Sequence, residues 1–311
     1  MFLDRIELNC RDKRGVTPLL NAAANSRVLL VELYLQYGAD VDLQTPEGNT
    51  ALTLSVGKMG NFPVIRMLLE AGANPNHTNK HGDSALFIAS KNGHLDQVEL
   101  LLEYNADINS INSNGLTPLQ AVIREKPVYG VGVANYLILA GACLTGLGEG
   151  ELRQVLAWAV EYNWVEVLPK LPISEKIVNM TTSHLDPPLN VAIRKGDIGI
   201  VDFLLSHNAN PWLEDYFRFS AFELAIKRDQ VQILELLIER TRNLRINIIQ
   251  GNVLLLRAAQ LGNPKMIQQV VNKIPCDINA KNEKGRTPIM IAVAKGHEDA
   301  VQALLALGAK I

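Results

Sequence analysis

A tripeptide of the form Gly-Ala-Asp returns along this chain of 311 residues at a nearly constant spacing. Its central alanines are Ala39, Ala73, Ala106, Ala142, Ala209 and Ala309. The first three intervals are 34, 33 and 36 residues, and the next two, 67 and 100 residues, are two and three periods. A period of this length means that each stretch forms one small unit, which must pack against its neighbours to bury its apolar face. We therefore expect a linear stack of similar units.

A second motif keeps the same period. The sequence Gly15-Val-Thr17-Pro18-Leu19 returns in related form at residues 48–52, 82–86, 115–119 and 285–289. Gly15 suits a turn with positive φ, and Thr17 is placed to cap a helix. Pro18 would take the first helical position, where its missing N–H costs nothing. Each unit is therefore predicted to start with a tight turn followed by a helix.

The remainder of a unit is clearest between residues 84 and 109. Gly93 is a typical end for the first helix. Val98, Leu101 and Leu102 follow at the spacing of one helical face, which predicts a second helix. An extended stretch then leads to the next turn.

These motifs resemble the ankyrin repeat, whose pattern is approached closely by residues 79–109 and 282–310. The resemblance covers nearly the whole chain and implies an all-α fold. This fold would be an ankyrin-repeat solenoid of about nine helix-turn-helix units with β-hairpin tips. A single ankyrin-repeat domain, residues 1–311, would contain repeats at 12–44, 45–78, 79–111, 112–144, 145–179, 180–212, 213–244, 245–279 and 280–311.

The repeat at 145–179 is degenerate. It keeps the apolar spacing of a helix but lacks the turn-and-cap motif, and it carries Trp158, Trp164, Pro169 and Pro172. We expect the stack to be irregular near residues 145–180, as a bend or as a local binding feature.

Composition excludes several classes of partner. The net charge is −2 and the isoelectric point is near 6.3, so nothing attracts the chain as a whole to nucleic acid or to an anionic membrane. Aromatic residues make up 5%, too few for a base-stacking platform. No apolar run is long enough for membrane insertion. Cys10, Cys143 and Cys276 lie too far apart to indicate a disulfide framework or a zinc site, so we expect a cytoplasmic monomer.

No motif in the sequence indicates catalysis. The six histidines form no His-Glu-x-x-His motif, and there is no Cys-x-x-Cys pair, nucleophile elbow or phosphate-binding loop. We therefore expect a protein that is not an enzyme, without catalytic residues, metal or cofactor.

The resemblance implies a concave face, lined by the hairpin tips and the first helices, as the place where a protein partner binds. Tip candidates are Lys13, Arg14, Lys80 and His81. A basic residue also stands near the end of most first helices, namely Lys58, Lys91, Arg124, Arg194 with Lys195, Lys227 with Arg228, and Lys295. One explanation is the helix dipole, which favours a cation at the C-terminus. The other is electrostatic guidance of an acidic segment of the partner.

Five aromatic residues crowd one stretch: Trp212, Tyr216, Phe217, Phe219 and Phe222. Trp212 and Tyr216 are candidate anchors for a partner, because aromatic side chains dominate many interfaces. The alternative is that these rings fold back over neighbouring repeats.

One modification follows from the resemblance alone. Ankyrin asparagines in the setting of Leu101, Asp107 and Ile108 can be hydroxylated, which makes Asn109 a candidate. The alternative is that this asparagine only forms hydrogen bonds within the repeat.

The sequence as a whole indicates a protein–protein interaction module that acts as a scaffold, adaptor or targeting unit. Because the repeat pattern breaks off at residues 308–311, the chain could instead be a regulatory or substrate-docking region of a larger enzyme or channel. A third hypothesis, by analogy with the family, is an effector of an intracellular bacterium that acts in the host cytoplasm.

Overall fold

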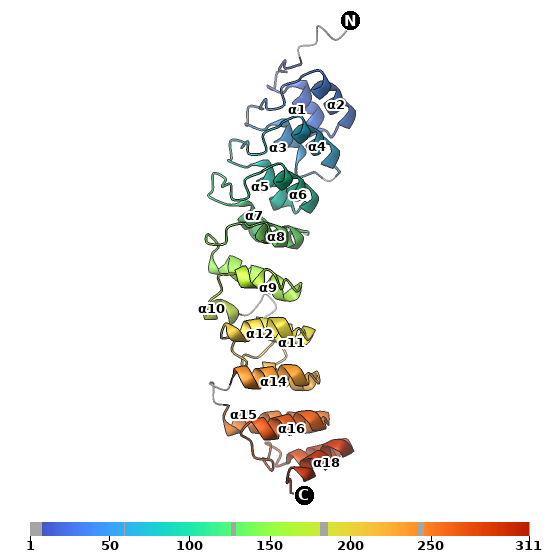
Figure 1. The fold of residues 1–311 in the computed structure, drawn as a ribbon, viewed down its shortest axis with the longest axis vertical. Helices are drawn as coiled ribbons and strands as arrows, with labels where there is room; N and C mark the ends of the chain where they lie inside the picture. Colours follow the sequence, from blue (N-terminus) through green and yellow to red (C-terminus); the bar gives the residue numbers. More distant parts are fainter. Residues whose placement is uncertain (1–7, 59, 126–128, 181–185, 242–245, 311) are drawn as a thin grey trace. The chain divides into compact units, whose positions relative to one another are not determined.

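The structure is a computed structural model that describes residues 8–58, 60–125, 129–180, 186–241 and 246–310. Over these residues the chain is helical and contains no β-strand, as Figure 1 shows. Contacts within the chain divide it into two compact units, residues 1–151 and 152–311, and each is described by itself. The predicted all-α repeat fold is confirmed.

The first unit is built from pairs of short helices. The first helices of these pairs are α1 (Pro18–Ala24), α3 (Ala51–Ser55), α5 (Ala85–Asn92) and α7 (Pro118–Glu125). The second helices are α2 (Val28–Gln36), α4 (Phe62–Glu70), α6 (Leu95–Glu103) and α8 (Gly130–Leu139). First helices pack against first helices, and second helices against second helices, in chain order. Each layer therefore buries its apolar side against the next, as the period predicts.

The helix starts follow the predicted chemistry. The Oγ1 of Thr17 accepts a hydrogen bond from the backbone N–H of Leu20, with Pro18 at the first helical position. Ser84 caps α5 in the same way, and α5 ends at Gly93 with a φ of 77°. The predicted cap, helix and stop residues are confirmed in these repeats.

The loops that precede the first helices form tight tips. The Oδ1 of Asn79 accepts hydrogen bonds from the N–H groups of His81 and Asp83, at 2.9 and 3.1 Å. The same geometry recurs at Asp12, Asn112, Asp215 and Asn282. Because one side chain takes two of the loop's N–H groups, few remain for a strand ladder. In the described residues the β-hairpins expected at the tips are therefore tight loops, with one isolated antiparallel bridge between Thr78 and Ser84.

The second unit repeats the arrangement after an irregular start. Helix α9 (Glu149–Glu161) crosses the boundary between the units. The pairs that follow are α11 (Pro188–Lys195) with α12 (Ile198–Ser206), α13 (Ala221–Lys227) with α14 (Val231–Arg240), α15 (Ile248–Leu261) with α16 (Pro264–Lys273), and α17 (Pro288–Lys295) with α18 (Glu298–Ala306). As in the first unit, α11, α13, α15 and α17 pack in series.

The predicted irregularity near 145–180 is confirmed. In place of a second helix, α9 is followed by a 3-10 turn, η1 (Leu168–Lys170), and a single helical turn, α10 (Glu175–Val178). Pro169 and Pro172 lack the N–H groups that a continuous helix would need here. Trp164 and Leu168 are nevertheless buried, so this segment still contributes apolar packing to its unit. That it bends the stack stays a prediction.

A second series of hydrogen bonds joins neighbouring repeats just after the second helices. In each case a side-chain oxygen of one repeat accepts from a backbone N–H of the next, as between Asn76 and Asp107 at 2.7 Å. The other pairs are Asn9–Asp40, Asp42–Asn74, Asn109–Cys143, Asn179–Asn210 and Asn279–Lys310. These bonds fix the register between layers with polar groups, while the helices supply the apolar contact.

Candidate interaction surface

In each unit the tip loops and the first helices share one surface, which we call the tip face. A groove of about 360 Å³ in the first unit shows this, because it is lined by His81 and Asn114 from two tips and by Lys91 and Arg124 from α5 and α7. The resemblance implies that a partner protein binds on this surface.

The predicted tip residues of the first unit are all exposed. Lys13, Lys80 and His81 project at the turns. The Nε of Arg14 lies 3.2 Å from the Oδ2 of Asp12. The backbone N–H of Val16 and then Arg14 lower the pKa of that carboxyl, although burial opposes them. Arg14 therefore supports its own turn, whereas Lys13 and Lys80 carry charges that are open to solvent.

The cations at the ends of the first helices bind neighbouring repeats in the first unit. Lys58 donates to the backbone oxygen of Ala24 in the preceding repeat. Lys91 approaches Glu125 of the next repeat at 3.7 Å, and the Nε of Arg124 lies 2.6 Å from an Oε1 of Glu151. The series predicted to guide an acidic partner is thus engaged here in contacts between repeats.

The pKa of Glu151 records this engagement. Burial opposes its charge, but hydrogen bonds from Arg124 and from the N–H of Gly148 outweigh that cost and lower the pKa of the carboxyl. A lowered pKa contributes stability above the ordinary pKa of a glutamate, and this stability is lost as the pH falls through the folded value.

Replacing Arg124 with methionine is expected to lower the free energy of unfolding by about 0.5 kcal/mol at neutral pH, since Arg124 is half exposed and solvent weakens the pair. Urea unfolding at neutral pH and at a pH below the pKa of Glu151 would check this. The difference between variant and parent should disappear in acid. An equal difference at both pH values would show that Arg124 acts through packing alone.

Arg194 in the second unit lies in a tighter network. Its guanidinium donates to the Oδ2 of Asp186 at 2.5 Å and to the Oδ2 of Asp215 at 2.8 Å. Asp215 is only 4% exposed, and its other oxygen accepts from the N–H groups of Phe217 and Phe219. The remaining oxygen of Asp186 accepts from the N–H of Tyr216. Arg194 therefore holds the tip at residues 215–219 against α11.

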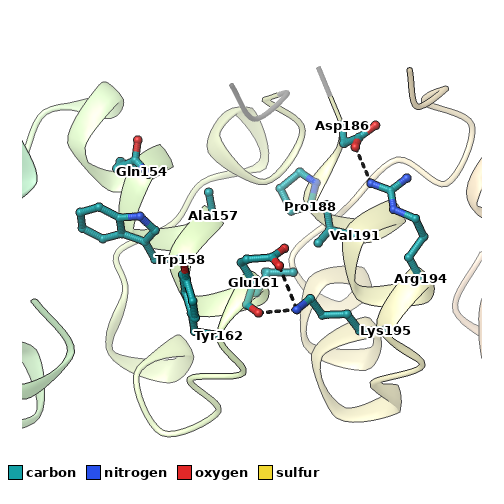
Figure 2. A pocket seen from close by; sticks show the side chains of 11 residues that line it. Gln154, Ala157, Trp158, Glu161, Tyr162, Asp186, Pro188, Val191, Arg194 and Lys195 are labelled. Carbon is teal, nitrogen blue, oxygen red and sulfur yellow. Dashed lines mark hydrogen bonds and ion pairs between the residues drawn. The ribbon is translucent and has the colours of Figure 1, made fainter. Parts of the chain in front are cut away.

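The recess beside Arg194 is lined by two cations and two carboxylates, so their charges balance. This recess is a cavity of about 530 Å³ that lies between α9 and α11. Figure 2 shows Trp158 and Tyr162 on one side of it. Its cations are already occupied: Lys195 donates to the backbone oxygen and to a carboxylate oxygen of Glu161, and Arg194 is bound to Asp186. No free charge of this group is left to attract a ligand.

The cations of the later repeats differ. The ammonium of Lys227 lies 4.0 Å from the ring centroid of Phe219, a cation–π contact. Arg228 and Lys295 are exposed, and neither forms an ion pair or side-chain hydrogen bond with any residue of the described ranges. The cations early in the chain are therefore bound to neighbouring repeats, whereas Arg228 and Lys295 are available to a ligand. Stabilisation by the helix dipole and guidance of an acidic partner both stay predictions.

The rings of the aromatic cluster differ in their surroundings. Trp212 stacks on the buried ring of Phe222 in the next repeat at 4.7 Å, so it belongs to the packing between repeats. Tyr216 and Phe217 are each 68% exposed at the tip and meet edge to face at 5.3 Å. Phe217 was not among the candidate anchors drawn from the sequence, although the alignment of its tip with the earlier tips could have identified it. Asp215 occupies the place of Asn79, which sets residues 216 and 217 where Lys80 and His81 stand.

The Asn109 side chain takes part in the bonding between repeats. It is exposed, and its Oδ1 accepts from the N–H of Cys143 at 2.8 Å. The structural role expected for Asn109 is a bond within its own repeat, whereas this bond joins it to the next repeat. Hydroxylation of Asn109 stays a prediction.

The described residues contain no group of three or more histidine, cysteine, aspartate or glutamate side chains that could hold a metal ion. Among the same residues, no helix combines the length and the apolar character needed to cross a membrane.

Comparison with known proteins gives partial matches to longer chains. The chain is 34% identical over 107 residues to a putative ankyrin repeat protein of fowlpox virus (strain NVSL), which covers 34% of this chain and 18% of that protein. It is 39% identical over 116 residues to ankyrin repeat and SOCS box protein 16 of Mus musculus, a match that covers 35% of this chain and 26% of that protein. It is 26% identical over 193 residues to the palmitoyltransferase ZDHHC13 of Homo sapiens, a match that covers 62% of this chain and 31% of that protein. The chain therefore spans less than a third of the length of each of these relatives.

A family model gives a broader match. The model described as ankyrin repeats (3 copies) matches residues 2–79, 60–146 and 222–311, which together are more than half of the chain. The stretch outside these matches, residues 147–221, contains most of the degenerate repeat and the exposed aromatic tip. The chain belongs to the ankyrin-repeat family, whose repeats are generally protein–protein interaction modules and typically not catalytic.

Proposed function

We propose that this chain binds a partner protein through its tip face and serves as a scaffold, adaptor or targeting module. The observation that carries the proposal is the pair Tyr216 and Phe217, two large aromatic side chains that are 68% exposed. Isolated apolar residues are common on surfaces, but two adjacent rings on a loop held by a buried carboxylate form a rigid anchor.

The energetics favour binding through such a pair. Asp215 accepts two backbone hydrogen bonds within the loop and Asp186 accepts a third, so the loop is ordered before a partner arrives. An ordered anchor loses little conformational entropy on binding. Each ring also offers a large apolar area together with a definite geometry.

Replacing both Tyr216 and Phe217 with serine is expected to reduce recovery of a specific partner from extracts of the native cell by at least about tenfold. Quantitative mass spectrometry of proteins retained by the immobilised chain would measure this. Replacing Tyr129 with serine is the matched control, because that tyrosine is also 68% exposed but lies at the start of a second helix.

The control should leave recovery unchanged, and both variants should keep the parent's melting temperature, since exposed rings contribute little to folding. Equal recovery by all three proteins would remove the aromatic tip from the proposed binding surface.

A second candidate is a regulatory or substrate-docking region of a larger protein. The observation that favours it is the partial match to the human palmitoyltransferase, of which this chain covers 31%. The complete open reading frame would decide between the two, because a catalytic domain beside the repeats would favour this second candidate.

A further inference from the structure

The last two first helices, α15 and α17, border a groove of about 560 Å³ on the tip face. Its floor is aliphatic: Ile249, Val253 and Leu256 lie along one side of α15, and Ile291 lies opposite on α17. Ile249 is 71% exposed and Val253 is 47% exposed. A helix that packs fully against its own protein does not present such a stripe to solvent.

The rim of this groove is basic. Lys281, Lys284 and Arg286 come from the tip that precedes α17, and Lys295 comes from the end of α17. Glu283 is the one carboxylate among the lining residues. None of the four cations forms an ion pair or side-chain hydrogen bond with another residue that the structure describes. Their charge is therefore available to a ligand, unlike that of Arg124 or Arg194.

We infer that this groove binds a segment of the partner protein in which aliphatic or aromatic side chains are flanked by carboxylates. The inference rests on the proposed function and adds to it the place and the chemistry of the ligand. The apolar floor would bury the partner's apolar side chains, and the four cations would meet its carboxylates. A single-stranded nucleic acid fits less well, because the groove is lined by no aromatic ring on which bases could stack.

Selection from a random peptide library displayed on phage, with the whole chain as bait, tests the inference without a known partner. The selected peptides should be enriched in aspartate and glutamate together with leucine, isoleucine or phenylalanine. Their affinity should fall as the ionic strength rises from about 0.05 M to about 0.5 M, because salt screens exposed charges.

Fluorescence anisotropy of a labelled selected peptide then locates the site with two groove variants, one that changes the cations and one that changes the apolar floor. The double replacement of Lys284 and Lys295 with glutamate should weaken binding by at least about tenfold. Its matched control reverses Arg27 and Lys265, two exposed cations that lie at second helices and outside the tip face, and should leave binding unchanged.

The apolar floor is tested in the same assay. Replacing Ile249 and Val253 with serine should again weaken binding by at least about tenfold. Replacing Ile248 with serine is the control, because that residue is 53% exposed on the same helix but does not line the groove. All four positions of the two test variants are exposed, so circular dichroism melting curves should match those of the parent.

The outcomes separate the inference from the function on which it rests. Selected peptides that are basic or uncharged, or that bind the groove variants and the parent equally, would overturn the inference. The proposed function would still hold if the partner binds elsewhere on the tip face. Displacement of the peptide by a single-stranded RNA at lower concentration than by unlabelled peptide would reassign the groove to nucleic acid. Failure to select any peptide, together with failure of the parent chain to recover any specific partner, would contradict both proposals.

Discussion

Replacing Arg194 with methionine is expected to lower the free energy of unfolding of the second unit by about 3 kcal/mol. Methionine keeps most of the aliphatic stem but leaves Asp186 and Asp215 without their cation. The side chain of Asp215 is 1% exposed, so water cannot take the place of the guanidinium. Urea unfolding followed by circular dichroism would measure the loss.

The same variant should loosen the aromatic tip. The N–H groups of Tyr216, Phe217 and Phe219 bond to the two carboxylates that Arg194 neutralises. Without the cation these carboxylates should turn toward water, and amide hydrogen exchange at the three positions should become faster. Arg194 would then support partner binding through the position of the tip, without touching the partner.

Arg240 provides the matched control for Arg194. It lies 2.6 Å from Asp202, a distance as short as those in the Arg194 network, but the two side chains are 44% and 40% exposed. An ion pair so accessible to solvent contributes little, so replacing Arg240 with methionine should cost less than about 1 kcal/mol. Equal losses for the two variants would contradict a buried network at Arg194.

The regular part of the fold could be predicted from the sequence because its determinants are local. Thr17 caps the helix that it precedes, and Gly93 ends the helix that it follows, so neighbouring residues suffice to place these elements. The break near residues 145–180 was predictable for the same reason, since Pro169 and Pro172 cannot continue a helix.

The candidate site was less predictable because its chemistry depends on contacts between repeats. Arg194 and Arg228 both follow the apolar residues of a first helix, yet Arg194 is bound by two carboxylates and Arg228 is exposed. Their difference arises from Asp186 and Asp215, which lie in two tips, and no local pattern links these tips to Arg194. Trp212 and Tyr216 likewise separate into packing and exposure only when the tip folds. A repeat pattern thus predicts which element carries a residue, whereas the packing of neighbouring repeats determines which groups its side chain contacts.

Gly251 is a position where another segment of the same repeat leaves no room for a side chain. It lies in the first half of α15, and a Cβ placed on it would stand 2.0 Å from the backbone oxygen of Pro275 and 3.1 Å from the Cβ of Cys276. Contact with a backbone oxygen cannot be relieved by rotating a side chain, so α15 or the loop at Pro275 must move. Replacing Gly251 with alanine is therefore expected to lower the free energy of unfolding by about 3 kcal/mol.

The sign of that change is the informative part, because alanine ordinarily stabilises a helix relative to glycine by about 0.5–1 kcal/mol. Gly199 in α12 provides the comparison: a Cβ there would meet no atom closer than the Oδ1 of Asp197 at 3.5 Å. Replacing Gly199 with alanine should therefore raise stability in the same urea experiment, while replacing Gly251 lowers it. Since α15 also forms the floor of the basic groove, the Gly251 variant should bind a selected acidic peptide more weakly. A Gly251 variant as stable as the parent would mean that α15 does not pack this closely against residues 275 and 276.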